Sequence, residues 1–512
     1  MHWLNLPEPE SDRPLAFQDL AGAKAWLAAQ PQAQPLLMQS ALSEQVNAID
    51  AAQLAPALAV ELLNRLHGAI IPAQTSLEVR FTRKALPMSN EEERIFAAAH
   101  KLWTRLGIAY LRLAPHFGPK EKCPLLFRAA NAFRMAEFTH FQASRDCPSR
   151  LDDLLLAVLV QGASAGILRQ AHNDSDFRHF GEANIAGILA WAFLLRLIDP
   201  YHLTAAQLIV ANRTLSRWRE LCNFQADTEQ SPHSLDVHLA SCFGAKLPEG
   251  IPGYLNIHPI IRKTHSRIVS LRTGASPESL KLGRELSGTA CIRLLTDIEQ
   301  QLRHPGEGSQ AAQEQGEITL AFGTEHAYAV HRNELLNPEA TMDVQSETLS
   351  NQRMAVFGFD QVANMPTAVR KLEIPYENWM QTAGKAIRQG SGGIRRLAPC
   401  LIATHHSGQP QLGVLRALLA DADGTLSASL DWFSGNVEAC RLQQQGLRDT
   451  KQPRIAVFLL TNGHQLSLVL PTSAPIRPGI GLALEGDFVR HLVPTEVIDR
   501  GIDFVRYACR PS

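Results

Sequence analysis

Apolar residues recur three and four positions apart through most of the first three hundred residues, a spacing that places them along one face of a helix. The segment that begins at Ser89 shows this most clearly, because Ser89 followed by Glu92 is a capping-box pattern for a helix start. The apolar positions behind that cap fall on one face: Ile95, Ala98, Leu102, Leu106 and Tyr110. We expect further helices at about 123–145, 151–170, 184–198, 203–222 and 276–303. No repeat of fixed period occurs, so the pattern indicates an irregular helical array.

The pattern changes after Arg303, where a polar, glycine-bearing linker leads into short apolar runs. Asp423-Gly424 and Asn462-Gly463 each stand between two such runs, which is a strong signal for a tight hairpin. The runs predict strands at 317–330, 353–359, 371–379, 401–405, 411–419, 426–433, 454–461, 464–470, 481–489 and 493–507. Closely spaced strands joined by such turns favour an antiparallel barrel or sandwich.

These two patterns predict an α+β multidomain protein, with an all-α helical array in the N-terminal half and an antiparallel β-barrel in the C-terminal half. The expected divisions are an N-terminal tail at 1–15, a helical domain at 16–303, a linker at 304–316, a β extension at 317–369 and a barrel at 370–512.

Composition and charge exclude several classes of protein. Lysines and arginines number 49 and aspartates and glutamates 50, so no global positive field recruits polymeric nucleic acid or an anionic membrane. The eight cysteines contain no C-x-x-C pair, which argues against a zinc ribbon or a disulfide framework. The most apolar stretch, Ile185 to Leu195, is too short to span a membrane, and the N-terminus lacks a signal-peptide pattern. We therefore expect a cytoplasmic protein without membrane insertion.

One stretch departs from this even balance of charge. Between Arg370 and Arg416 stand seven basic residues and two acidic ones, and no Asp or Glu occurs between Asn378 and Ala420. Within it lies the run Arg388-Gln389-Gly390-Ser391-Gly392-Gly393-Ile394-Arg395-Arg396. Glycines let a ligand approach backbone N–H groups, and guanidinium forks match the geometry of phosphate. A hairpin turn with solvated arginines is the alternative interpretation.

Several of these segments resemble known proteins. The run Leu412-Gly413-Val414-Leu415-Arg416-Ala417, followed by Asp423-Gly424-Thr425-Leu426 and Trp432-Phe433, resembles the strand-turn-strand of PilZ-type barrels. In that family such a hairpin follows a Ser/Gly loop, and Ser391-Gly392-Gly393 stands in the matching place. More of the chain is similar to a long β-proteobacterial family of PilZ-like proteins with a helical N-terminal half, labelled as cyclic-di-GMP-binding proteins or as molecular chaperones. The similar segments are Phe17–Leu27, Ile257–Leu294, Tyr376–Trp379 and Glu496–Phe504.

The resemblance implies a PilZ-like barrel over 370–512 and cyclic di-GMP as a regulatory ligand, with no other cofactor and no metal. PilZ domains bind this ligand with an R-x-x-x-R segment before the barrel and a D/N-x-S-x-x-G loop within it. Here Gln389 replaces the Asp or Asn of the loop, and Arg370-Lys371 is the nearest basic pair before it. The candidate ligand-binding residues are Arg370, Lys371, Arg388, Gln389, Ser391, Gly392, Gly393, Arg395 and Arg396.

Three further features bear on a ligand or metal site. Trp379 is a candidate stacking surface for a base, with burial in the core as the alternative. Arg213 and Arg217 have the R-x-x-x-R spacing, but in a predicted helix that spacing simply places both on one exposed face. The run His172-x-Asp174-x-Asp176 gathers polar side chains that suit a metal, although such clusters are usually turns.

A second motif points to a different kind of chemistry. Gly162-Ala163-Ser164-Ala165-Gly166 matches the G-x-S-x-G elbow of serine hydrolases, which makes Ser164 a candidate nucleophile. The neighbouring segments have helical patterns, however, and the elbow needs parallel strands beneath it. Close packing of helices through small residues is the alternative interpretation.

Together these observations predict a non-enzymatic bacterial signalling effector or adaptor. We expect its β half to bind cyclic di-GMP, or another small phosphate-bearing ligand, and its helical half to bind a protein partner. A degenerate PilZ-like scaffold that binds only protein partners is one alternative, and a serine hydrolase at Ser164 is another.

Overall fold

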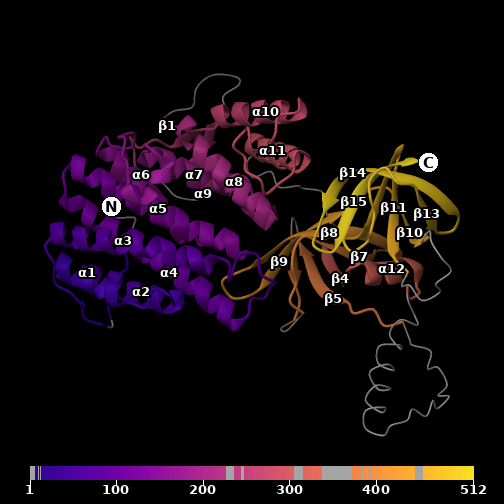
Figure 1. Ribbon diagram of the computed structural model, residues 1–512, viewed down its shortest axis with the longest axis horizontal. Coiled ribbons are helices and arrows are strands. Elements are labelled where there is room, and N and C mark those ends of the chain that lie inside the picture. Colours follow the sequence, from indigo (N-terminus) through magenta and orange to yellow (C-terminus); the bar gives the residue numbers. More distant parts are fainter. Residues whose placement is uncertain are drawn as a thin grey trace, which may run out of the picture. The chain divides into compact units, whose positions relative to one another are not determined.

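The computed structural model describes residues 6–9, 11, 13–226, 236–243, 247–304, 315–336, 372–382, 385–390, 394–406, 408–443 and 454–512. The chain falls into two compact units: Met1–Ser309 together with Leu419–Gly424, and Gln310–Leu418 together with Thr425–Ser512. The first unit is mainly helical (indigo to magenta in Figure 1) and the second is mainly β (orange to yellow). The predicted order, a helical region followed by an antiparallel β region with a closed barrel, is confirmed.

The helical unit is built mainly from long helices. They are α1 (Leu20–Ala29), α2 (Pro35–Ala51), α3 (Pro56–Glu78), α4 (Asn90–Leu113), α5 (Pro119–Ala143), α6 (Ser149–Ser164), α7 (Ile185–Leu197), α8 (Ala205–Trp218), α10 (His258–Arg272) and α11 (Gly288–Arg303). Shorter helical elements are η1 (Ala114–His116), η2 (Ser175–Phe180), η3 (Pro200–His202), η4 (Arg219–Leu221) and α9 (Leu239–Phe243). A small sheet has the strand order β1 (Asn223–Gln225), β3 (Tyr254–Asn256) and β2 (Asp236–His238).

Local sequence signals determine where several of these helices begin. At the start of α4 the Ser89 hydroxyl accepts a hydrogen bond from the Glu92 N–H, and the Glu92 carboxylate accepts one from the Ser89 N–H at 2.7 Å. This is the predicted capping box. Thr204 and Gln207 make the same pair of bonds at the start of α8. Each box satisfies backbone N–H groups that the first helical turn leaves without partners.

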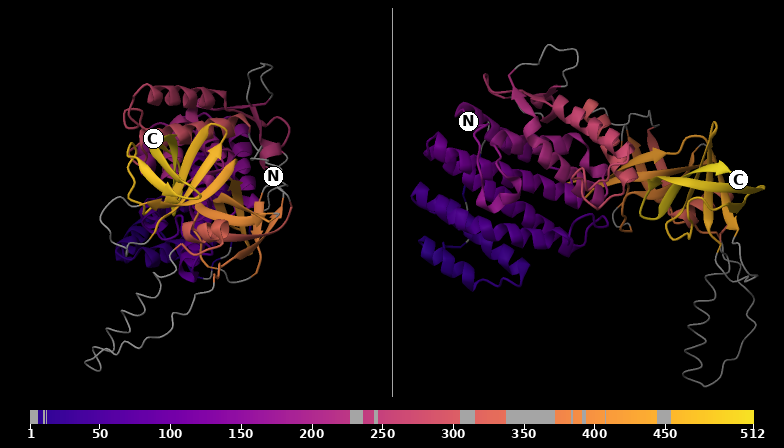
Figure 2. Two further views of the ribbon diagram at one scale, coloured as in Figure 1. Left: turned by 90° about the vertical axis from the view of Figure 1, so that its right-hand side faces the viewer. Right: turned by 45° about the horizontal axis from the view of Figure 1, so that its top comes forward.

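The core of the helical unit is organised around α5. Residues Leu125 to Ala143 of this helix are buried almost continuously, and α4 and α7 pack against it (Figure 1). Figure 2 shows the long helices stacked in rows with similar axis directions. α7 is buried from Ile185 to Leu195, which explains why this stretch is the most apolar of the chain. Within the described ranges, no helix combines the length and the apolar content needed to cross a lipid bilayer.

The strands of the second unit close two antiparallel barrels. The first has the strand order β4 (Gly316–Phe322), β5 (Glu377–Thr382), β6 (Lys385–Arg388), β9 (Leu426–Trp432), β8 (Gln409–Ala420) and β7 (Cys400–His406). The second has the order β10 (Asn436–Gln443), β11 (Ala456–Asn462), β12 (Gln465–Pro471), β15 (Phe504–Pro511), β14 (Val489–Arg500) and β13 (Leu482–Glu485). One helix, α12 (Thr324–Arg332), packs against strands of both barrels.

Both predicted hairpin turns are confirmed. Asp423-Gly424 lies in the connection between β8 and β9, and Gly463, which follows Asn462 at the end of β11, lies in that between β11 and β12. The φ angles of Gly424 and Gly463 are 87° and 57°, and glycine adopts such positive values without a steric cost.

The range predicted as one strand of the β unit divides into a strand and a helix. The sequence predicts a strand over 317–330, but β4 ends at Phe322 and α12 begins at Thr324. Gly323, with a φ of 86°, ends the strand between them. The buried side chains of α12 include Ala327 and Val330, three positions apart, which is helical spacing that a short apolar run does not reveal by itself.

The number of barrels also differs from the expectation. The sequence predicts a single barrel over 370–512, preceded by an extension, whereas β4 pairs with both β5 and β7 and is itself a barrel strand. The predicted strand at 353–359 lies outside the described residues. Strand partners are chosen by contacts between distant segments, and the alternation within each strand does not report them.

One close contact in the helical core tests how tightly it packs. An added Cβ at Gly107 of α4 would lie 2.4 Å from Cε1 of Phe133, a fully buried ring on α5. We therefore expect Gly107→Ala to lower the free energy of unfolding by about 1–3 kcal/mol, despite the better helix propensity of alanine. Urea denaturation followed by circular dichroism measures the change.

Gly68→Ala in α3 is the matched control for that substitution. The atom nearest to its added Cβ, Asp176 Oδ1, is 3.5 Å away, an ordinary contact. This change should raise the free energy of unfolding by about 0.5–1 kcal/mol. Equal and small effects at the two glycines would contradict the tight packing of α4 against α5.

Candidate functional site

The Gly-rich segment that the sequence singles out follows strand β6 of the first barrel. Five of its candidate residues lie outside the described residues: Arg370, Lys371, Ser391, Gly392 and Gly393. Of the others, Arg388 ends β6 and Gln389 follows it, while Arg395 and Arg396 come between the Gly-rich loop and β7. Arg388 and Arg396 therefore stand at the two ends of this loop.

Arg388 and Arg396 converge on one carboxylate, that of Glu377 at the start of β5. Arg396 donates a hydrogen bond from Nε to Glu377 Oε1 at 2.9 Å, and its Nη2 lies 2.8 Å from the same oxygen. Arg388 Nη2 lies 3.0 Å from Glu377 Oε2, close enough for an ion pair although the angle does not make a hydrogen bond. Because two guanidinium groups share one carboxylate, this cluster keeps one net positive charge.

Solvent reaches the two arginines to different degrees. The Arg388 side chain is 7% exposed, and its Nη1 donates a hydrogen bond to the Ile394 carbonyl at 3.2 Å. The Arg396 side chain is 21% exposed, and its guanidinium carbon lies 4.1 Å from the centroid of the Phe322 ring, a cation–π contact. Arg396 is thus better placed to meet a ligand, whereas Arg388 braces the loop.

The remaining candidates in this region have contrasting surroundings. Gln389 and Arg395 are exposed. The Gln389 N–H donates to the Asn378 carbonyl at 2.8 Å, which ties the start of the loop to β5. Trp379 is 1% exposed and belongs to the barrel interior, so it is a core residue and not a stacking surface for a ligand.

The G-x-S-x-G segment does not form a nucleophile elbow. Ser164 is the last residue of helix α6, and the described elements next to it in sequence are helical. The elbow requires a strand before the serine. An added Cβ at Gly162 would lie 2.6 Å from Leu168 Cδ2, so the small residue permits close packing of the chain here. Close packing through small residues was the alternative to a nucleophile elbow that the sequence offered.

The side chains of His172, Asp174 and Asp176 belong to an ion-pair network centred on Arg128. Arg128 donates from Nε and Nη2 to the two carboxylate oxygens of Asp174 at 2.7 and 3.0 Å, and Nη2 also lies 3.2 Å from Asp176 Oδ2. Burial favours the protonated form of Asp174, but hydrogen bonds from His172 and Arg128 outweigh it and hold the pKa of Asp174 well below its usual range. Among the residues that the structure describes, no group of three His, Cys, Asp or Glu side chains is arranged to hold a metal ion.

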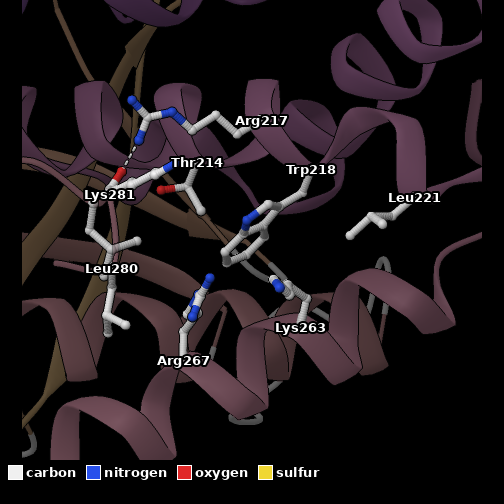
Figure 3. A pocket seen from close by; sticks show the side chains of 9 residues that line it. Thr214, Arg217, Trp218, Leu221, Lys263, Arg267, Leu280 and Lys281 are labelled. Atoms are coloured by element: carbon white, nitrogen blue, oxygen red, sulfur yellow. Dashed lines mark hydrogen bonds between the residues drawn. The ribbon is translucent and has the colours of Figure 1, made fainter. Parts of the chain in front are cut away.

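A basic cavity lies elsewhere in the helical unit, between α8 and α10 (Figure 3). Its volume is about 700 Å³. The lining residues are Thr214, Arg217, Trp218, Leu221, Lys263, Arg267, Leu280, Lys281 and Leu282. Four of them are cations and none is an acid, so the cavity has the charge of an anion site.

Two helices and one loop position these side chains. Trp218 follows Thr214 by four residues on α8, and Lys263 and Arg267 are four residues apart on α10, so each pair lies on one helix face. Leu221 belongs to η4, the short helix that follows α8. In Figure 3 the indole of Trp218 points from α8 toward α10, and the side chains of Lys263 and Arg267 point toward α8.

The cations of this cavity are not neutralised by the acids that follow in the chain. Glu285 is paired with Arg213 at 2.5 and 2.8 Å, and the Arg213 guanidinium lowers the pKa of Glu285 to about 2. Glu278 is paired with Arg284. Arg267 Nε is buried and has no hydrogen-bond partner among the described residues. Among the residues that the structure describes, no acid pairs with Lys263, Arg267 or Lys281, so the cavity offers an unused donor together with an excess of positive charge.

Sequence reasoning missed this cavity. The sequence indicates only that Arg217 shares an R-x-x-x-R spacing with Arg213 and lies with it on an exposed helix face. The signal that points to a site is the aromatic Trp218 beside Arg217, combined with the Lys263–Arg267 spacing on a second helix. Those segments are more than forty residues apart in sequence, so nothing local predicts that they face each other.

Comparison with known protein families relates part of the helical unit to a described family. No curated protein and no solved structure matches the chain. Residues 21–230, fewer than half of the 512 and reaching from α1 to the sheet strand β1, match the family model described as the N-terminal domain of the cyclic-di-GMP receptor FimW. The α8 wall of the basic cavity lies inside the matched residues and the α10 wall lies beyond them. The match supports a relation of the helical region to a family of cyclic-di-GMP receptors.

Proposed function

We propose that this protein is a cytoplasmic, non-enzymatic signalling effector that binds cyclic di-GMP, or another small phosphate-bearing ligand, through its β unit. A protein partner binds to its helical unit. The observation that carries the proposal is the match of residues 21–230 to the N-terminal domain of a cyclic-di-GMP receptor. The PilZ-type resemblance of the β8–β9 hairpin supports the same ligand class.

The proposed site in the β unit is the Gly-rich loop with the basic residues around it: Arg370, Lys371, Arg388, Gln389, Ser391, Gly392, Gly393, Arg395 and Arg396. Arg395 and Arg396 neutralise the two phosphates of the ligand, and the N–H groups of the glycines donate to phosphate oxygens or guanine edges. Glu377 is a positioning residue, because its ion pair fixes the guanidinium of Arg396 before a ligand arrives.

One structural feature favours the alternative, a scaffold that binds only protein partners. Glu377 already occupies the guanidinium edges of Arg388 and Arg396 that a phosphate would need. A ligand must therefore use the remaining N–H groups of Arg396, or displace the carboxylate. Nucleotide binding separates the two functions.

Calorimetric titration of the intact chain with cyclic di-GMP tests the proposal. We expect saturable binding by the wild-type protein and roughly ten- to a hundredfold weaker binding by Arg395→Ala/Arg396→Ala, the loss expected for charge-assisted hydrogen bonds of about 1.5–3 kcal/mol. Glu377 keeps Arg388 as its partner in this variant, so the fold is retained. The salt concentration must be fixed, because ions screen arginine–phosphate attraction.

Arg477→Ala/Arg500→Ala is the matched control for that titration. It removes the same charge from exposed positions of the second barrel. Unchanged binding in the control and weakened binding in the site variant is the expected pattern. Equal affinities of wild type and site variant would place the ligand elsewhere. If titration of the wild type gives no heat, the alternative function, a scaffold that binds only protein partners, remains.

A further inference from the structure

We infer that the basic cavity between α8 and α10 is a second ligand site, one that binds a purine nucleotide carrying two or more phosphate charges. The site lies in the helical unit and shares no residue with the Gly-rich loop of the β unit. The inference therefore stands apart from the proposed function, and either can fail without the other.

The charge of the cavity selects an anion. Its cations are Arg217, Lys263, Arg267 and Lys281, and the neighbouring acid Glu285 is held by Arg213. A single carboxylate or monovalent anion would leave most of this charge uncompensated. A ligand with two or more phosphate charges matches it better, and the guanidinium fork of Arg267, with Nε free of other partners within the described chain, suits a phosphate oxygen.

The walls of the cavity select a planar ring as well as a phosphate. The Trp218 indole lines one side of the cavity. Apolar surface is added by the side chains of Leu221, Leu280 and Leu282. Trp218 is 8% exposed, so a purine that enters between α8 and α10 can stack only on the part of the indole that faces the cavity, as bases do on aromatic side chains in nucleotide-binding proteins. Inorganic phosphate would leave this apolar surface uncovered, so a nucleotide fits the lining better than the bare anion.

The size of the cavity agrees with a small molecule. Its volume of about 700 Å³ lies within the usual range for pockets that bind cofactors and drug-sized ligands, roughly 300–1,000 Å³. Arg217 donates a hydrogen bond to the Lys281 carbonyl, which ties α8 to the loop that closes one side of the cavity. A fixed wall of this kind reduces the ordering cost of binding.

Calorimetry on the intact chain with GDP as the probe tests the inference. We expect wild-type protein to bind GDP, and Lys263→Ala/Arg267→Ala to bind it at least tenfold more weakly. Arg262→Ala/Arg272→Ala is the matched control, because it removes two exposed cations from the same helix without touching the cavity. This control should bind GDP as the wild type does. If the double variant unfolds, Lys263→Gln alone serves, since it removes one charge and keeps a polar side chain at this position.

Two further titrations separate the ring from the phosphates. Inorganic pyrophosphate should bind more weakly than GDP, and Trp218→Leu should lose that difference while Trp218→Phe keeps part of it. Equal affinity for pyrophosphate and GDP, or no GDP binding by the wild type, would overturn the inference. Arg395→Ala/Arg396→Ala, in the β unit, should leave GDP binding unchanged, so loss of this site and loss of the proposed function are distinguishable.

Discussion

Arg128→Met should lower the free energy of unfolding by about 3–5 kcal/mol, the range observed when one partner of a buried ion pair is removed. The Asp174 carboxylate is completely buried and takes both of its short ion-pair contacts from Arg128. Arg128 also donates to Asn64 Oδ1 at 2.8 Å, and the substitution removes this hydrogen bond as well. Urea denaturation at pH 7 measures the loss.

The same variant should change the response to acid. The pKa of Asp174 in the folded protein lies well below its ordinary value of 3.8, so the ion pair contributes its full stability above that value and loses it as the pH falls further. The stability difference between wild type and Arg128→Met should therefore be largest at neutral pH and shrink below about pH 4. Arg178→Met, which removes a nearby exposed arginine, should cost less than about 0.5 kcal/mol. If Arg128→Met itself lowers the free energy of unfolding by less than about 0.5 kcal/mol, Arg128 does not stabilise the buried Asp174 carboxylate as described.

Arg196→Met should have an effect of similar size, about 3–5 kcal/mol, because Arg196 serves two buried carboxylates. Its Nε lies 3.1 Å from Glu137 Oε1 and its Nη2 lies 2.6 Å from Asp152 Oδ1. Burial raises the pKa of Glu137 to about 7 and that of Asp152 to about 6, against the attraction of Arg196. Without Arg196 both acids lose the strongest attraction that offsets their burial, and Glu137 keeps the weaker attraction of Arg134. Thermal or urea unfolding of the variant measures the cost.

The dependence of this loss on pH gives a second readout. A carboxyl group whose pKa is raised by folding stabilises the fold while it is protonated and loses that contribution as the pH rises toward its folded pKa. Removal of Arg196 raises both pKa values further, so the variant should lose more stability at pH 8 than at pH 5. Glu137→Gln and Asp152→Asn, added to Arg196→Met, should recover part of the loss and flatten the pH dependence. Arg150→Met, in an exposed pair with Asp153, is the control and should cost less than about 1 kcal/mol. A larger loss at pH 5 than at pH 8 would show that the buried acids are not its cause.

The features of the fold that could be predicted are those encoded locally. The capping box at Ser89 and Glu92 is a four-residue signal, and the hairpin signalled by Asn462-Gly463 turns at Gly463, whose φ is positive. The helix α12 and the second barrel were not predicted. Short apolar runs fit a strand or a helix equally well, and closure of a barrel depends on which distant strands pair.

The candidate sites show the same division between local and distant information. The excess of basic residues around Arg388 is visible in the sequence, but its neutralisation by Glu377 is not. That contact arises because β5 and β6 pair in antiparallel register, with Trp379 opposite Arg388, which brings residues on either side of the hairpin together. The basic cavity requires α8 to face α10, and residues beyond the matched region complete it.

Equilibrium dialysis of the intact wild-type chain against cyclic di-GMP tests the central claim most directly. The proposed function predicts saturable retention of the ligand, which weakens as salt is raised because phosphate contacts are screened. The variant Lys263→Ala/Arg267→Ala, which lacks two cations of the α8–α10 cavity, should retain the ligand as well, and GTP in excess should not displace it from this variant. Equal ligand concentrations on both sides of the membrane, up to millimolar cyclic di-GMP at low salt, would contradict the claim that this protein is a cyclic-di-GMP effector.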